Sequence, residues 1–178
     1  MPELPEVETT VRGLARYLDG ARIERVVLNR PDLRRPFPED LVQVMTGAKV
    51  TGLSRRAKYG LIHLDRAQSV IFHLGMSGRW RIDPEEDDTH DHMVMETASN
   101  RFALCAPRRF GSVDMVASEA LEEWPQFAAM GPEPLGPGLT AEHLKAALKG
   151  KTQSIKLCLL DQRIVAGLGN IYVCEALW

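Results

Sequence analysis

The hydrophobic periodicity of this chain changes twice, and each change marks a different kind of structure. Near the N-terminus, apolar residues recur three and four apart, which predicts one amphipathic helix with Pro5 in its first turn and Gly20 at its end. Its apolar stripe comprises Leu4, Val7, Val11, Leu14 and Leu18. From Arg22 to about Ala117, short β-rich runs alternate with turn residues, which is typical of an antiparallel sandwich or barrel. The expected strands lie within residues 23–29, 49–56, 59–64, 69–75, 91–96, 101–106 and 110–116.

A segment dense in proline and glycine, Met130–Gly138, is the expected domain boundary. After it the pattern becomes helical, with Thr140 expected to cap one helix and Thr152 the next. The predicted fold class is therefore α+β, an N-terminal helix plus an antiparallel β-sandwich followed by a helical module. We expect the two domains to span residues 1–130 and 131–178.

Composition excludes several protein classes. No apolar run approaches the length of a membrane span, and the acidic N-terminus is not a signal peptide, so we expect a cytoplasmic protein without a membrane partner. The three cysteines are odd in number and form no Cys-x-x-Cys motif, which argues against a disulfide framework and against a four-thiolate metal site. Cys158 and Cys174 are flanked by apolar residues, and we expect both in the core.

The formal net charge is only −2, but the charges are segregated along the chain. Residues 21–60 hold nine basic and four acidic side chains, whereas residues 83–96 hold seven acids and no bases. Such segregation can give a basic face that binds nucleic acid and an acidic face that does not. Ordinary solvated patches explain the same counts equally well.

Pro2 could carry chemistry if Met1 is removed, because its nitrogen would then be a free secondary amine. An α-amine titrates at about pH 8, so a useful neutral fraction exists at physiological pH. A neutral amine that attacks a sugar or carbonyl carbon gives an iminium, with Glu3 placed to act as general acid or base. The structural alternative is that Pro and Glu simply favour helix starts. With Met1 retained, the Pro2 nitrogen is an amide and no nucleophile.

Seven motifs are spread over the whole chain: MPELPEVET, RRAKYG, HLGMSGRW, HDHMV, PRRFG, GPEPL and VAGLGNIYVCEALW. In this order they resemble bacterial formamidopyrimidine-DNA glycosylases, and Leu4 favours that family over the related endonuclease VIII. The resemblance implies a β-sandwich, a helix-two-turn-helix module and a C-terminal zinc finger with four cysteines. The module is incomplete here and the finger is absent, so we interpret the chain as truncated and expect no cofactor in it.

The resemblance also implies an activity. Members of the family are monomeric enzymes that excise oxidised purines, chiefly 8-oxoguanine and formamidopyrimidines, from double-stranded DNA and then cleave the abasic site by β,δ-elimination. By position, Pro2 resembles the nucleophile that attacks C1′ and Glu3 the acid that assists sugar-ring opening. Lys58 resembles the lysine that contacts phosphates beside the lesion and donates a proton during elimination. A solvated strand-end lysine is the alternative for Lys58.

Further DNA contacts are implied by position. Met76, Arg108 and Phe110 match the residues that fill the gap left by the extruded nucleotide, although core packing alone would account for Met76 and Phe110. The remaining residues that align with DNA contacts are His90, Lys151, Lys156 and Asn170. The glycine turn before Asn170 could hold a phosphate through its backbone N–H groups, or it could simply cap a helix.

One residue departs from the family pattern. Ala106 stands where the family usually has Asp, which removes a carboxylate beside the arginines of the PRRFG motif. Two other functions remain open: a truncated, catalytically inactive DNA-binding paralogue, and an N-terminal-proline tautomerase that acts on small keto acids.

Overall fold

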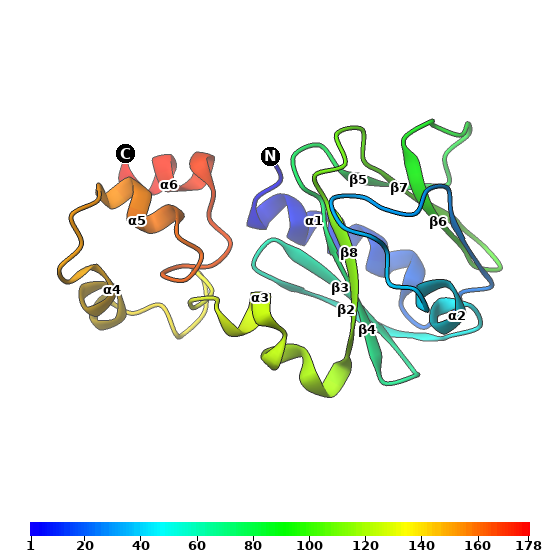
Figure 1. Cartoon of the computed structure of the whole chain (residues 1–178), viewed down its shortest axis with the longest axis horizontal. Coiled ribbons are helices and arrows are strands. Elements are labelled where there is room, and N and C mark those ends of the chain that lie inside the picture. Colours follow the sequence, from blue (N-terminus) through cyan, green and yellow to red (C-terminus); the bar gives the residue numbers. More distant parts are fainter.

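Two antiparallel four-stranded sheets face each other in one lobe of the molecule, and three helices form the other (Figure 1). The computed structural model describes residues 1–178. The strands are β1 (Arg25–Leu28), β2 (Val50–Arg56), β3 (Tyr59–Leu64), β4 (Gln68–His73), β5 (Arg79–Ile82), β6 (Asp91–Glu96), β7 (Arg101–Cys105) and β8 (Ser112–Ala117). The helices are α1 (Leu4–Leu18), α2 (Leu41–Met45), η1 (Ser118–Glu123), α3 (Pro125–Ala128), α4 (Ala141–Leu148), α5 (Ile155–Leu160) and α6 (Asn170–Leu177).

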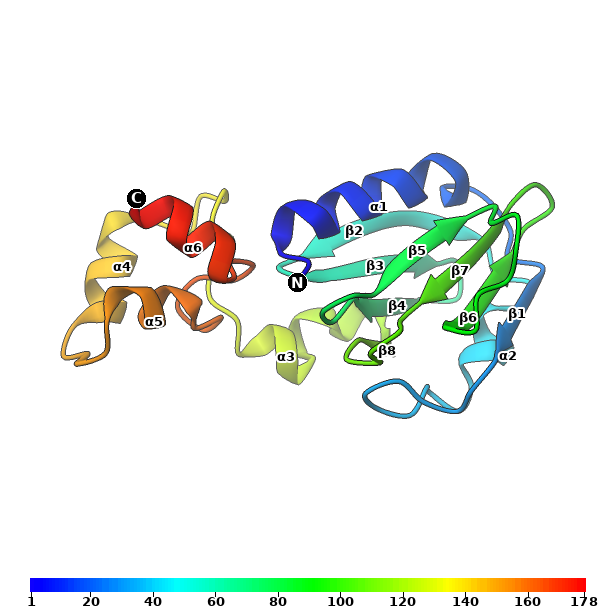
Figure 2. The same cartoon turned by 90° about the horizontal axis from the view of Figure 1, so that it is seen from above.

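The strand order is β1-β6-β7-β5 in one sheet and β2-β3-β4-β8 in the other, which confirms the predicted antiparallel sandwich. Helix α1 lies along the sandwich (Figure 2), and the whole apolar stripe predicted for it is buried. Four residues of the stripe, from Val7 to Leu18, belong to a core of 23 buried residues to which both sheets contribute. Burial of each Leu or Val side chain contributes about 1.5–3 kcal/mol, so this stripe fixes the start of the chain to the sandwich.

The structure differs from the sequence prediction at several short elements. Strand β5 was not predicted because two of its four residues are arginines, and α2, η1 and α3 are too short to show a period. Thr140 caps α4 as predicted, but α5 is capped by Ser154 rather than Thr152. Cys158 is buried as expected, whereas Cys174 is exposed, because Val173 is the only residue of α6 that is buried.

No helix of the chain has both the length and the apolar character needed to cross a membrane.

Candidate functional site

The N-terminus lies where the two lobes meet (Figure 2). Glu3 is only 1% exposed, and its carboxylate reaches from the start of α1 to the start of α6. It accepts hydrogen bonds from the backbone N–H groups of Gly169 (2.8 Å), Ile171 (2.8 Å) and Tyr172 (3.2 Å). A carboxylate is favoured at a helix N-terminus because it satisfies unpaired N–H groups and interacts with the helix dipole. The sequence left open whether the glycine turn holds a phosphate or caps a helix, and in the structure the Gly169 N–H binds a carboxylate of the chain itself.

Further contacts hold the same junction. Leu4 donates its backbone N–H to the carbonyl of Gly167 (3.1 Å), and the Tyr172 hydroxyl donates to Glu6 (3.2 Å). The other Glu6 oxygen accepts from the Glu3 backbone N–H at 2.9 Å, which completes a capping box. The first residues of the chain are thus fixed to both lobes.

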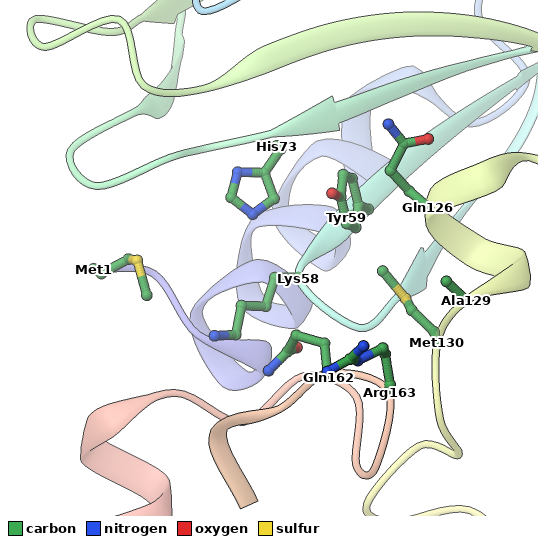
Figure 3. A pocket seen from close by; sticks show the side chains of 9 residues that line it. All are labelled: Met1, Lys58, Tyr59, His73, Gln126, Ala129, Met130, Gln162 and Arg163. Carbon is green, nitrogen blue, oxygen red and sulfur yellow. The ribbon is translucent and has the colours of Figure 1, made fainter. Parts of the chain in front are cut away.

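A cavity of about 320 Å³ opens beside these first residues (Figure 3). Its lining consists of Met1, Lys58, Tyr59, His73, Gln126, Ala129, Met130, Gln162 and Arg163. Burial lowers the pKa of Lys58, while the negative charge of Glu3 raises it, so the ammonium group lies within electrostatic range of that carboxylate. The structure therefore places Lys58 near Glu3, in a cavity that Met1 also lines.

His73 was missed by the sequence analysis, although it opens the HLGMSGRW motif. Its Nδ1 accepts the Gly75 N–H at 3.0 Å, which leaves the ring proton on Nε2. Burial, together with the positive charges of Lys58, Arg34 and Arg35, lowers the pKa of His73 to about 4. At neutral pH the ring is uncharged and can donate a single hydrogen bond from Nε2.

Two loops that carry predicted DNA contacts touch through glycines. A Cβ on Gly75 would lie 2.4 Å from the Gly111 nitrogen, and one on Gly111 would lie 2.4 Å from the His73 carbonyl oxygen. This close backbone approach sets the β4–β5 loop, with Met76, against the β7–β8 loop, with Phe110. Both side chains are apolar yet 43% and 45% exposed, so neither fills the core. The Arg108 guanidinium carbon lies 4.8 Å from the Phe110 ring centroid.

Cations without a carboxylate partner gather at these loops. Arg34 joins them by donating its backbone N–H to the Gly111 carbonyl (3.1 Å). Arg34, Arg108 and Arg109 are exposed, and none of them forms an ion pair with an acidic residue of the chain. Arg34 and Arg109 were not singled out from the sequence. Three unpaired guanidinium groups on adjacent loops are suited to bind phosphates.

His90 and Ala106 flank the same loops. Ala106 donates its N–H to the His90 carbonyl (2.9 Å), while the exposed His90 ring contacts Asp88 through Nδ1 (2.9 Å). Ala106 is 3% exposed, and its carbonyl oxygen accepts a hydrogen bond from His92 Nε2 (3.1 Å). The methyl group therefore occupies a buried position where the resemblance implies a carboxylate.

The remaining predicted contacts lie on the helical lobe. Lys151 and Asn170 are exposed and Lys156 is half-buried, and none of them lines the cavity. Lys151 lies close enough to Asp161 to help Arg163 lower the pKa of that carboxyl to about 2. Nowhere in the chain do three His, Cys, Asp or Glu residues form a group that could hold a metal ion, so its residues do not fit a zinc site.

Comparisons with known proteins give one consistent result. Residues 1–113 match the family model for the formamidopyrimidine-DNA glycosylase N-terminal domain, and residues 130–178 match the model for its H2TH domain. Among curated relatives, the formamidopyrimidine-DNA glycosylase of Erythrobacter litoralis is 74% identical over 178 residues, and that of Novosphingobium aromaticivorans is 69% identical over 179. The alignments cover the whole chain but 66% of each relative, so the chain spans about two thirds of their length.

Solved structures agree. The Lactococcus lactis enzyme bound non-covalently to DNA with an abasic site is 33% identical, with a TM-score of 0.91 over 99% of this chain and 68% of its own. The same enzyme in complex with DNA containing N7-benzyl-Fapy-dG gives a TM-score of 0.92 at the same identity, over 99% of this chain and 66% of its own.

Proposed function

Because the chain belongs to the formamidopyrimidine-DNA glycosylase family, we propose that it acts as a monomeric base-excision repair enzyme on double-stranded DNA. Its substrates are oxidised purines, namely 8-oxoguanine and formamidopyrimidines. Residues 1–130 form the catalytic domain and residues 131–178 part of the DNA-binding domain. The observation that carries the proposal is the junction itself: the chain start, Glu3 and Lys58 meet beside one cavity between the lobes.

Pro2 is the nucleophile once Met1 has been removed. The amine nitrogen bonds to C1′ of the damaged nucleotide, and the C1′–base bond breaks as the base leaves. Glu3 then passes a proton to the ring oxygen as the sugar opens to an iminium. Because the Glu3 oxygens accept hydrogen bonds from three backbone N–H groups, we assign Glu3 a relay role, in which it receives the proton that the Pro2 amine loses.

Lys58 serves the elimination steps that cleave the DNA backbone. Its lowered pKa makes it a better proton donor than an exposed lysine, because a lower pKa favours release of the proton. As an ammonium it also binds the phosphate beside the lesion.

The DNA surface runs across both loop tips and onto the helical lobe. Met76 and Phe110 wedge into the base stack, and Arg108 hydrogen-bonds the orphaned partner base, so that the three offset the unstacking of the extruded nucleotide. Sequence-independent phosphate contacts come from the residues that the sequence aligned with DNA and from the two arginines found in the structure. They are His90, Lys151, Lys156 and Asn170, together with Arg34 and Arg109.

Borohydride trapping tests the proposal. A chain shown by mass spectrometry to lack Met1 should form a covalent adduct with an 8-oxoguanine duplex, because reduction fixes the iminium. Pro2→Gly should lose the adduct and Pro5→Ala, the matched control on α1, should keep it. Glu3→Gln should lose base excision and retain some cleavage at a preformed abasic site.

Two outcomes would contradict this. Equal loss of both activities in Glu3→Gln would refute the division of roles between Pro2 and Glu3. If neither the 178-residue chain nor the chain extended by the C-terminal third of a relative forms an adduct, the chain is a non-catalytic DNA-binding protein.

A further inference from the structure

Glu133 reaches from the linker between the lobes to the turn that carries Lys58. Its Oε1 accepts the backbone N–H of Ala57 (2.5 Å) and the guanidinium of Arg56 (3.1 Å), and its Oε2 accepts from Arg55 (2.8 Å). The side chains of Arg55 and Glu133 are 14% and 24% exposed, so these bonds are largely shielded from water. One carboxylate therefore makes three hydrogen bonds to a single turn of the other lobe.

That turn requires support from outside. Ala57 and Lys58 form the two-residue connection between β2 and β3, and Ala57 has a φ of 53°. A positive φ suits the first position of a tight hairpin turn but is unfavourable for an L-residue. Arg55 donates to the Ala57 carbonyl (2.9 Å) while Glu133 accepts its N–H, so both polar groups of Ala57 are held in place.

The same contacts extend to the N-terminal helix. Arg55 also donates to Glu8 of α1 at 2.7 Å, four residues after the start of that helix. Burial raises the pKa of Glu133, but hydrogen bonds from the Ala57 N–H and the two arginines lower it by more. The pKa is therefore below its usual value, and the carboxylate is charged at neutral pH. The linker, the Lys58 turn and α1 are thus joined through the half-buried pair of Arg55 and Glu133.

From these contacts we propose that Glu133 is a positioning residue for Lys58. It holds the turn so that the Lys58 side chain points toward the cavity. The orientation of that side chain therefore depends on how the linker packs against the sandwich. The proposal rests on the function proposed above, since it assumes that Lys58 serves elimination. We assign Glu133 no contact with DNA.

Three variants of the 178-residue chain test this role. Glu133→Ala should lower the single-turnover cleavage rate at an abasic site about tenfold to a hundredfold, because misplacing a reacting group by an ångström has effects of this size. The Kd for the same duplex should change less than twofold. Glu133→Gln retains an oxygen for Ala57 and Arg56 and should recover most of the rate. Glu8→Gln, which removes the other carboxylate on Arg55, is the matched control and should leave the rate unchanged.

A double-mutant cycle shows whether the effect passes through Lys58. Adding Glu133→Ala to Lys58→Ala should cost no further rate, whereas independent effects would multiply. Amide exchange of Ala57, followed by NMR without DNA, should accelerate at least tenfold in Glu133→Ala and stay unchanged in Glu8→Gln.

The outcomes separate the two proposals. If the wild-type chain cleaves no DNA but exchange at Ala57 accelerates as expected, the proposed function fails and the positioning of the turn stands. Unchanged exchange in Glu133→Ala, multiplying rate losses in the cycle, or an equal loss in Glu133→Gln and Glu133→Ala would each overturn the role of Glu133.

Discussion

His73 shows how its surroundings set the chemistry of one side chain. A histidine at a strand end would ordinarily titrate near pH 6.5, but here burial and three neighbouring cations lower its pKa to about 4. The Gly75 N–H fixes the tautomer. The result is a neutral hydrogen-bond donor that faces the cavity beside the positive charge of Lys58.

This arrangement predicts a pH dependence of stability. Below pH 6.5 His73 is protonated in the unfolded chain, but in the folded chain it stays neutral until about pH 4. The free energy of unfolding of the wild type therefore falls as the pH drops through this window. Relative to His73→Gln, the wild type should lose at most about 1.4 kcal/mol per pH unit between pH 6.5 and 4. Urea unfolding of both chains at each pH measures this, since all other groups are common. A difference independent of pH would contradict the buried neutral state.

At the scale of elements, the sequence predicts those helices and strands whose residue pattern is set by neighbours a few positions apart. The α1 stripe and the Thr140 cap follow from residues a few positions apart, and the structure confirms them. Strand β5 did not follow, because its arginines hide the alternation and only pairing with β7 makes it a strand. The cap of α6 did not follow either, since its donors lie 166 or more positions from Glu3.

The residues of the candidate site were likewise predictable from the sequence only in part. The motifs that carry Pro2, Glu3 and Lys58 single these residues out in the sequence, and of the three only Lys58 lines the cavity. The roles of Glu133 and Arg34 depend on which backbone groups meet in three dimensions, and no short-range signal in the sequence reports this.

The contact between Glu3, at the start of α1, and the start of α6 gives a prediction at the scale of elements. A Cβ added at Gly169 would lie 2.6 Å from the Glu3 Cδ and Oε1 atoms, so Gly169→Ala should displace the carboxylate and destabilise the protein by about 1–3 kcal/mol. Gly13→Ala is the matched control, because Gly13 lies in α1 with nothing within 4 Å of the added Cβ. It should stabilise α1 by up to about 1 kcal/mol. Thermal unfolding compares the two, and an equal effect would show that the close approach at Gly169 is unimportant.

At the scale of the whole molecule, the arrangement of charges matters more than their sum. The net charge of −2 argues against a nucleic-acid partner, yet many arginines are already neutralised within the chain. Arg25 pairs with Glu96 (3.6 Å), and Arg101 pairs with Asp87 (2.5 Å). Arg30 and Arg35 of the β1–α2 loop are likewise paired, with Asp32 and Asp114. Arg34 of that loop and Arg108 and Arg109 of the β7–β8 loop have no such partners, so the positive potential available to a polyanion concentrates at these three residues.

A salt titration distinguishes paired from unpaired cations. Replacing both Arg34 and Arg109 with Ala should weaken binding to a fluorescent duplex and reduce the slope of log K against log salt by about 0.9 for each phosphate that the protein no longer neutralises. The double variant of Arg25 and Arg101 removes the same two charges, but its carboxylate partners already occupy those guanidinium groups, so the slope should stay at the wild-type value. Fluorescence anisotropy between about 50 and 200 mM salt measures both. Equal slopes in the two double variants would mean that overall charge, rather than these two loops, draws DNA to the protein.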